Sequence, residues 1–236
     1  MKVRSKRLEF EHFTNLANEW WEDTGKFKIL HDLQPIRMQY IVEQTKPKNI
    51  ENLNILDLGC GGGLICEPLA RLGAKVTGVD FVKENIQAAK VHAIENNLKI
   101  TYLKQDLENL NLKKKYDIII IFEVIEHLKD VSEFIKKIKL HLKQNGNLLI
   151  STINRNIISK IFAIYVAENL LNWIPKETHD YNKLVKPEEL TNILEKENFY
   201  IKNISGLFFN PITIQLSALL LIQVIASPLA ADYSLA

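Results

Sequence analysis

The feature that most constrains the fold is a glycine-rich run directly after a short apolar segment. Residues 53–58 read LNILDL and are followed by GCGGG at 59–63. The apolar run predicts a buried strand, and the glycines allow a sharp turn that a ligand can approach without hindrance from a Cβ atom. Ligands of open α/β sheets bind beyond the carboxyl ends of the strands. The run therefore predicts a ligand-binding loop at the edge of such a sheet.

The remaining chain alternates between predicted strands and predicted helices. Continuous apolar strands that alternate with helices indicate an α/β fold, with a mainly parallel sheet covered by helices on both faces. Strands are expected at 53–58, 74–80, 99–105, 116–122, 147–152 and 199–204. Helices are expected at 9–22, 35–45 (opened by Pro35), 64–72, 83–96, 131–142 and 157–174, and after 186 with Pro187 in the first turn.

Composition excludes some classes of protein. The chain has 236 residues and a net charge of only +2, which argues against nucleic-acid binding through bulk electrostatics. Its two cysteines, Cys60 and Cys66, are too close in sequence to form a disulfide framework, so a reducing compartment is expected. The N-terminal residues contain no apolar stretch of the kind found in secretory signals. We therefore expect a cytoplasmic protein.

The spacing of the glycines separates two kinds of cofactor. A dinucleotide fingerprint would need a third glycine at position 64, which is Leu64, so a nicotinamide dehydrogenase is disfavoured. The run instead reads Asp57-x-Gly59-x-Gly61-x-Gly63. This acid-led pattern resembles the S-adenosylmethionine loop of class I methyltransferases, which have a Rossmann-like fold with seven strands.

Acidic residues follow three successive predicted strands. Asp57 suits the positive charges of the amino group and the sulfonium of S-adenosylmethionine. Asp80 ends the second strand, where it can accept hydrogen bonds from both ribose hydroxyls. Asp106 and Leu107 follow the third strand, where such folds hold the edge of the adenine. The alternative is that these acids and glycines are only turn residues.

Several stretches outside this loop carry a closer resemblance. They are ANEWW (17–21), GKFKILHDLQPIRMQYI (25–41), LDLGCGGGL (56–64), FEVIEHL (122–128), STINRN (151–156), PKETHDYNKLVKPEEL (175–190) and GLFFNPIT (206–213). Together they resemble the ubiquinone-biosynthesis O-methyltransferases, which methylate polyprenyl catechols and demethylubiquinol. The resemblance extends from about residue 9 to residue 213.

The resemblance implies roles for individual residues and a substrate. Arg37 would contact the carboxylate of S-adenosylmethionine, Gly59 and Asp80 would bind the cofactor, and Phe122 would pack on its adenosine or sulfur region. The implied reaction is O-methylation of polyprenyl phenols and quinols, at both such steps of ubiquinone biosynthesis. Two alternatives remain: methylation of another small hydroxylated acceptor, or an inactive cofactor-binding scaffold of a quinone-biosynthesis complex.

The sequence FEVIEH also suggests how a phenol is activated. If a helical turn follows the strand at 116–122, Glu123, Glu126 and His127 share one face and can hold Mg²⁺, Mn²⁺ or Zn²⁺. A metal bound to the acceptor oxygen would stabilise the phenolate. The alternative is that the glutamates cap or pair locally. Without a metal, His127 or His179 could act as general base, although His179 could equally bond to Asp180 in a loop.

Two apolar segments raise the question of a membrane. Residues 157–174 contain only two charged residues and a tryptophan near their end, as interfacial helices often do. A peripheral contact with the inner face of the membrane is expected; the alternative is a lid helix buried against the domain. Residues 216–230 are nearly all apolar and replace a polar connection usual in the family, whereas ADYSLA (231–236) echoes its last strand.

These observations predict one methyltransferase domain over residues 1–236. Its expected parts are a helical cap (1–50), a cofactor-binding core (51–152), an insertion for substrate or membrane (153–187), and a C-terminal helix with the last strands (188–236), atypical from residue 214.

Overall fold

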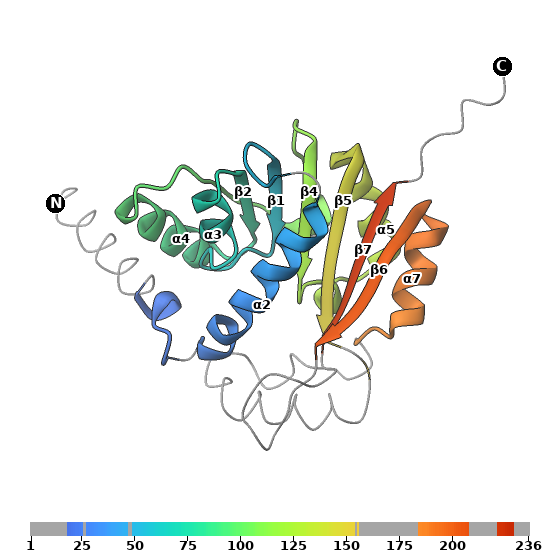
Figure 1. The fold of residues 1–236 in the computed structure, drawn as a ribbon, viewed down its shortest axis with the longest axis horizontal. Helices are drawn as coiled ribbons and strands as arrows, with labels where there is room; N and C mark the ends of the chain where they lie inside the picture. Colours follow the sequence, from blue (N-terminus) through green and yellow to red (C-terminus); the bar gives the residue numbers. More distant parts are fainter. Residues whose placement is uncertain are drawn as a thin grey trace. The chain divides into compact units, whose positions relative to one another are not determined.

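The structure is a computed structural model that describes residues 18–25, 27–46, 49–153, 155, 184–207 and 221–228 (Figure 1). Contacts divide the chain into two compact units, residues 1–109 and 110–236, and each is described by itself. The predicted helix at 157–174, His179 and the segment 231–236 lie outside the described residues.

The sheet of the first unit consists of three parallel strands. They are β1 (Asn54–Leu58), β2 (Lys75–Asp80) and β3 (Thr101–Lys104), in the order β3-β2-β1. The register places Asp57 opposite Gly78. Because the strands are parallel, their carboxyl ends meet at one edge of the sheet. This edge brings Asp57 and Asp80 together.

Three helices accompany these strands. They are α2 (Lys28–Thr45), α3 (Cys66–Arg71) and α4 (Lys83–Glu95); α3 and α4 contact β2, and α4 also contacts β3. The expected start of α2 at Pro35 is wrong, since Pro35 lies inside the helix. The helix instead begins where Lys28 N donates to the Gly25 carbonyl at 3.0 Å. A proline inside a helix removes one helical hydrogen bond, and its ring crowds the carbonyl four residues earlier.

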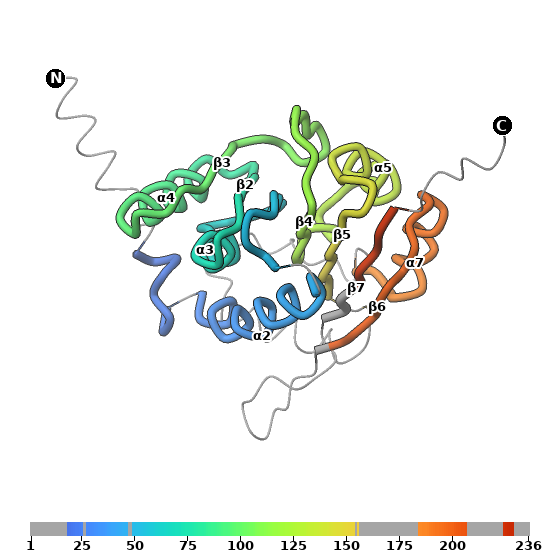
Figure 2. Tube along the Cα trace, turned by 45° about the horizontal axis from the view of Figure 1, so that its top comes forward, coloured from blue at the N-terminus to red at the C-terminus, as the bar shows by residue number. Residues whose placement is uncertain are grey.

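The second unit has one parallel and two antiparallel strand pairs. β4 (Tyr116–Phe122) runs parallel to β5 (Leu142–Ile153), and β7 (Leu221–Pro228) lies antiparallel between β5 and β6 (Phe199–Leu207). Helix α5 (Val131–His141) packs on β5, and α7 (Pro187–Lys196) packs on β6 and β7. Figure 2 shows α7 along β6. Pro187 opens α7 as predicted.

The apolar C-terminal segment provides the interior strand of this unit. Val224, Ile225 and Ala226 are successive residues of β7, and all three are buried. Since successive side chains of a strand point to opposite faces, both faces of β7 are covered. Residues 221–228 are therefore a strand paired on both sides, and not a connection between elements. The absence of charge in this segment follows from that position.

The predicted fold class is confirmed. The two units contribute seven strands in the described part of the chain. The pairs β1–β2, β2–β3 and β4–β5 are parallel, β5–β7 and β6–β7 are antiparallel, and helices pack on the strands of both units. The largest difference in a strand boundary is at β5, which begins at Leu142 directly after α5 and not at residue 147. Its pairing with β4 shifts register between Tyr116 and Ile118, which accommodates the early start.

Candidate functional site

The glycine loop of the first unit owes its spacing to backbone conformation. Gly59, Gly61 and Gly63 have φ angles of 77°, 52° and 91°, a region that other residues rarely adopt. The N–H groups of Gly59 and Cys60 both donate to the Val79 carbonyl, at 2.8 and 3.1 Å. The alternate glycines of the Asp57-led pattern are thus required by the shape of the turn.

Asp80 ties this loop to the end of β2. Its Oδ2 accepts a hydrogen bond from Gly61 N at 3.0 Å, and its Oδ1 accepts one from Val82 N at 2.8 Å. Burial raises the pKa of this carboxyl group above its usual range, although the two backbone N–H groups oppose the rise. Hydrogen bonds of the protein itself therefore hold the loop against the buried Asp80 side chain.

Asp57 lies in the same buried cluster. Burial raises its pKa to about 6, against the opposing effect of the hydrogen bond from the Cys66 thiol, whose Sγ lies 3.2 Å from Asp57 Oδ2. The charge of Asp80 raises the pKa further, and that of the buried Arg37 on α2 lowers it. Asp57 thus lies near both a second acid, Asp80, and the guanidinium of Arg37. A ligand with ammonium and sulfonium cations at one end and a carboxylate fits this donor set.

Asp106 has a local role that the sequence left open. Its Oδ1 accepts from Glu108 N at 3.0 Å and its Oδ2 from the side-chain amide of Asn109 at 2.8 Å, at the start of the 3-10 helix Leu107–Asn109. Leu107 is buried. Asp106 therefore stabilises its own turn, and a contact of Asp106 or Leu107 with a cofactor stays a prediction.

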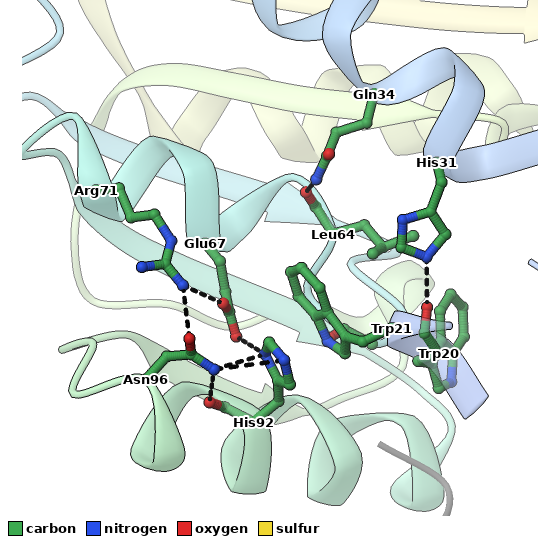
Figure 3. A network of polar contacts seen from close by, with 10 residues as sticks. Trp20, Trp21, His31, Gln34, Leu64, Glu67, Arg71, His92 and Asn96 are labelled. Atoms are coloured by element: carbon green, nitrogen blue, oxygen red, sulfur yellow. Dashed lines mark hydrogen bonds and ion pairs between the residues drawn. The ribbon is translucent and has the colours of Figure 1, made fainter. Parts of the chain in front are cut away.

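Two tryptophans adjoin the glycine loop, and sequence analysis assigned them no role. A Cβ atom added to Gly62 would lie 2.4 Å from Cγ of Trp20, and one added to Gly61 would lie 2.6 Å from Trp20 Cη2. The indole of Trp21 donates to the Gly62 carbonyl at 3.2 Å. Figure 3 shows both rings beside the loop residue Leu64. In the sequence, both tryptophans stand in ANEWW, a stretch that indicated only the family resemblance.

In the second unit, two hydroxyl residues of β5 hold the predicted metal-binding glutamates. Glu123 follows β4 with a φ angle of 51°, and its Oε1 accepts from the Ser151 hydroxyl at 2.6 Å. Glu126 is buried, and its Oε2 accepts from the Thr152 hydroxyl at 3.2 Å. Burial, followed by the charge of Glu123, raises the pKa of Glu126 to about 7. Ser151 and Thr152 are the first two residues of STINRN (151–156), a stretch to which the sequence alone assigned no structural role.

The expected common face of Glu123, Glu126 and His127 is wrong. The turn is a short 3-10 helix, Ile125–His127, so Glu123 precedes it; Glu126 points into the buried interior while His127 is exposed. Within the described ranges, no three His, Cys, Asp or Glu side chains form a group that could hold a metal. The residues as they lie do not fit a metal, and the ligand set stays a prediction. Phe122, the expected adenosine contact, is buried at the end of β4.

Comparisons with known proteins agree with this geometry. The methyltransferase domain family matches residues 29–203. The ubiquinone biosynthesis O-methyltransferase of Pelagibacter ubique is 46% identical over 212 residues, which cover 86% of this chain and 88% of the relative. That of Rickettsia typhi is 47% identical over 206 residues, covering 86% and 84%.

The solved structures show the same fold. Magnesium protoporphyrin IX methyltransferase from Synechocystis PCC 6803, solved with bound S-adenosylmethionine, is 21% identical and has a TM-score of 0.65, covering 95% of this chain and 97% of the other. In the part of the chain that the structure describes, no helix has the length and apolar character needed to cross a membrane. The predicted enzyme class is confirmed: the chain belongs to the ubiquinone biosynthesis O-methyltransferases, a family of S-adenosylmethionine-dependent methyltransferases.

Proposed function

We propose that the chain methylates hydroxyl groups of polyprenyl phenols and quinols, at both O-methylation steps of ubiquinone biosynthesis. The name shared by relatives at 46–47% identity supports this substrate class. The structural observation that carries the proposal is the glycine loop bonded to the Asp80 carboxylate beside the buried Asp57 and Arg37. This arrangement suits a ligand with an amino-acid end and a ribose.

S-adenosylmethionine, when bound, supplies a methyl group on a sulfonium sulfur. In the first unit, Arg37 would bind its carboxylate, Asp57 its ammonium group and Asp80 its ribose hydroxyls. The left-handed turn of the loop keeps side chains away from the ligand at the alternate glycines. The further residues proposed to contact the cofactor are Gly59, Gly61, Asp106, Leu107 and Phe122.

The acceptor must lose a proton for the transfer. A phenol has a pKa of about 10 and is mostly protonated at neutral pH. The oxygen–carbon bond forms as the sulfur–carbon bond breaks, and the phenol proton passes to a base, for which His127 and His179 are the candidates. His127 is exposed at the end of its short 3-10 helix. No step is assigned to a metal, because the described side chains do not converge on one.

The isoprenoid tail of the proposed acceptor is apolar and favours the lipid bilayer over water. Exposing such a tail to water costs about 0.8 kcal/mol per methylene group, so the acceptor stays in the bilayer. We propose that the apolar segment 157–174 contacts the inner face of the membrane peripherally. A quinone-biosynthesis complex is a further proposed partner, since its members would hand the same apolar intermediates from one to the next.

A methyl-transfer assay tests the function. Purified protein is given labelled S-adenosylmethionine and a short-tailed demethylated quinol or polyprenyl catechol, before and after dialysis against a chelator. The expected product is the labelled methyl ether. Cofactor binding without transfer to either acceptor would support the scaffold alternative instead. Activity that survives exhaustive chelation would assign the proton to a histidine base, and activity that returns only with Mg²⁺ or Zn²⁺ would assign it to metal-assisted ionisation.

A further inference from the structure

Trp21 contacts the glycine loop at the carbonyl of Gly62, a residue that lies between two left-handed glycines. Its indole N–H donates to Gly62 O at 3.2 Å, and Gly62 stands between Gly61 and Gly63, whose φ angles are both positive. Glycines in this region have many accessible conformations, so the peptide that joins them needs an external contact to hold one orientation. Gly63 N donates to Cys60 O at 2.9 Å. The peptide from Gly62 to Gly63 is thus held at both ends.

The indole of Trp21 is itself held by a ring on α4. It stacks on His92, with ring centroids 3.9 Å apart and an interplanar angle of 6°. His92 Nδ1 donates to Glu67 Oε1 at 2.7 Å, and Glu67 is completely buried. Figure 3 shows the line of contacts from Trp21 through His92 to Glu67. A buried carboxylate with a close partner has few alternative positions. The hydrogen bond to Glu67 therefore fixes the orientation of the His92 ring on which Trp21 stacks.

Glu67 connects this line back to the loop. Its backbone N–H donates to Gly63 O at 3.0 Å, and its other carboxylate oxygen pairs with Arg71 at 3.4 Å. Arg71 also donates to the Asn96 side chain at 2.9 Å. Helix α3 is therefore bonded to the loop through Glu67, and α4 carries His92, which contacts both Glu67 and Trp21. The ring of Trp20 also lies against Gly61 and Gly62, and it stacks on Phe27 with ring centroids 3.9 Å apart.

We propose that Trp21, held by His92 and Glu67, is a positioning residue that fixes the Gly62 carbonyl and so keeps the glycine loop in the shape that receives S-adenosylmethionine. The proposal rests on the cofactor site proposed above. Trp21 acts through the loop, and its contribution is made before the ligand arrives. The expected consequence of losing its N–H is weaker binding of the cofactor without a matching loss of acceptor binding.

The substitution Trp21→Phe tests this, because phenylalanine keeps an aromatic ring for His92 and lacks the indole donor. Calorimetric titration with S-adenosylhomocysteine should show affinity about three- to tenfold weaker than in the wild type. The KM for S-adenosylmethionine should rise similarly, while the KM for the acceptor and kcat at saturating cofactor stay within about twofold. Equal affinities in a folded variant would overturn the proposal.

The variant His31→Ala is the matched control. The His31 ring donates to the Trp20 carbonyl at 2.8 Å and meets the Trp21 ring edge-on, with centroids 6.3 Å apart, so this change loosens the same segment while keeping the Trp21 N–H and the His92 ring. Its melting temperature should fall while its affinity for S-adenosylhomocysteine stays within about twofold of the wild type. If both variants lose affinity equally, general loosening of the segment explains the effect and the positioning role is wrong.

A double-mutant cycle tests the part assigned to His92. His92→Gln should weaken S-adenosylhomocysteine binding in the wild-type background, and it should add little in the Trp21→Phe background, since both changes act on one contact. If the losses of affinity were additive, His92 would not act through Trp21. The titration of the wild type distinguishes failure of the proposed function from failure of the role given to Trp21. If the wild type does not bind S-adenosylhomocysteine, the proposed function is contradicted. If the wild type binds normally and Trp21→Phe binds equally well, only the role of Trp21 is contradicted.

Discussion

Asp80 and Gly61 are joined by a hydrogen bond in which the loop N–H donates to the carboxylate over 3.0 Å. The second carboxylate oxygen accepts from Val82 N at 2.8 Å. The Asn85 side chain and the Phe81 backbone also form hydrogen bonds with this carboxyl group. The residue proposed to bind the cofactor also holds the loop on which the cofactor would lie.

Asp80→Ala is expected to weaken binding of S-adenosylmethionine by about one to two orders of magnitude. The lost charge-assisted contacts are worth roughly 1.5–3 kcal/mol. Calorimetric titration measures the dissociation constant. The control is Asp32→Ala, which removes an exposed acid that pairs with Lys28 on α2 and should leave affinity unchanged. An unchanged dissociation constant in folded Asp80→Ala would remove Asp80 from the site.

Gly62→Ala should destabilise the protein through a clash with Trp20. The new Cβ would lie 2.4 Å from the indole Cγ, a separation that forces the ring to move. Overpacking of this kind costs about 1–3 kcal/mol, measurable as a lower midpoint of urea unfolding. Combining it with Trp20→Leu should recover part of the loss. Gly25→Ala is the control, because its Cβ would meet only the Glu22 side chain, at 3.0 Å and beyond.

Asp57 should make the stability of the ligand-free protein depend on pH. Its pKa is raised from 3.8 to about 6, so the folded state binds this proton more tightly than the unfolded state does. The stabilisation is fully present below about pH 4 and is lost as the pH rises through 6, a change of about 3 kcal/mol.

The comparison is between the wild type and Asp57→Asn, which keeps the size of the side chain and an oxygen that can accept from Cys66. Urea unfolding at several pH values from 4 to 7 should show the wild type losing stability relative to the variant as the pH rises. Parallel stability curves over this range would mean that the pKa of Asp57 is not raised on folding.

Thr152→Val should lower the free energy of unfolding by about 1–3 kcal/mol, because the buried Glu126 carboxylate would lose the hydroxyl that donates to it. Urea unfolding provides the measurement. Thr191→Val is matched to it, since that hydroxyl donates to the Glu188 carbonyl on an exposed part of α7 and should matter little. If both variants lost the same free energy of unfolding, the hydrogen bond from Thr152 to the buried Glu126 would not be the cause.

Membrane contact through residues 157–174 is tested by replacing Ile161, Phe162 and Ile164 with charged residues. Each change removes apolar contact worth about 1.5–3 kcal/mol, so co-sedimentation with liposomes of anionic and zwitterionic lipids should be lost. Turnover of a short-tailed, water-soluble acceptor should survive, and turnover of a long-tailed acceptor in vesicles should fall. If both activities collapse and the melting temperature drops, the segment belongs to the core.

The local pattern of the sequence was sufficient to predict most elements of the first unit. β1 and β2 are short, apolar and bounded by glycine or acid, and the period of each pattern is set by residues that are neighbours in the chain. The alternate glycines and the acids at strand ends also predicted the loop and its neighbour Asp80, because parallel strands bring their carboxyl ends to one edge.

The sequence failed where partners distant along the chain decide the outcome. Residues 221–228 are apolar without an obvious period, and only pairing with β5 and β6 makes them an interior strand. The shared face expected of Glu123, Glu126 and His127 assumed an α-helical turn. The buried hydroxyls of Ser151 and Thr152, 28 and 26 residues further on, instead bond the two glutamates beside a short 3-10 helix.

Residue types and their spacing thus indicated the cofactor. An acid, three alternate glycines and a second acid at a strand end form the pattern that resembles an S-adenosylmethionine loop. Tertiary structure alone decided how that loop is held. Trp21 lies 41 residues before the Gly62 carbonyl that it contacts, and Glu67 lies 25 residues before the His92 ring that it fixes. Hydrogen bonds and ring contacts between such distant residues depend on the packing of the helices, and no local pattern encodes them.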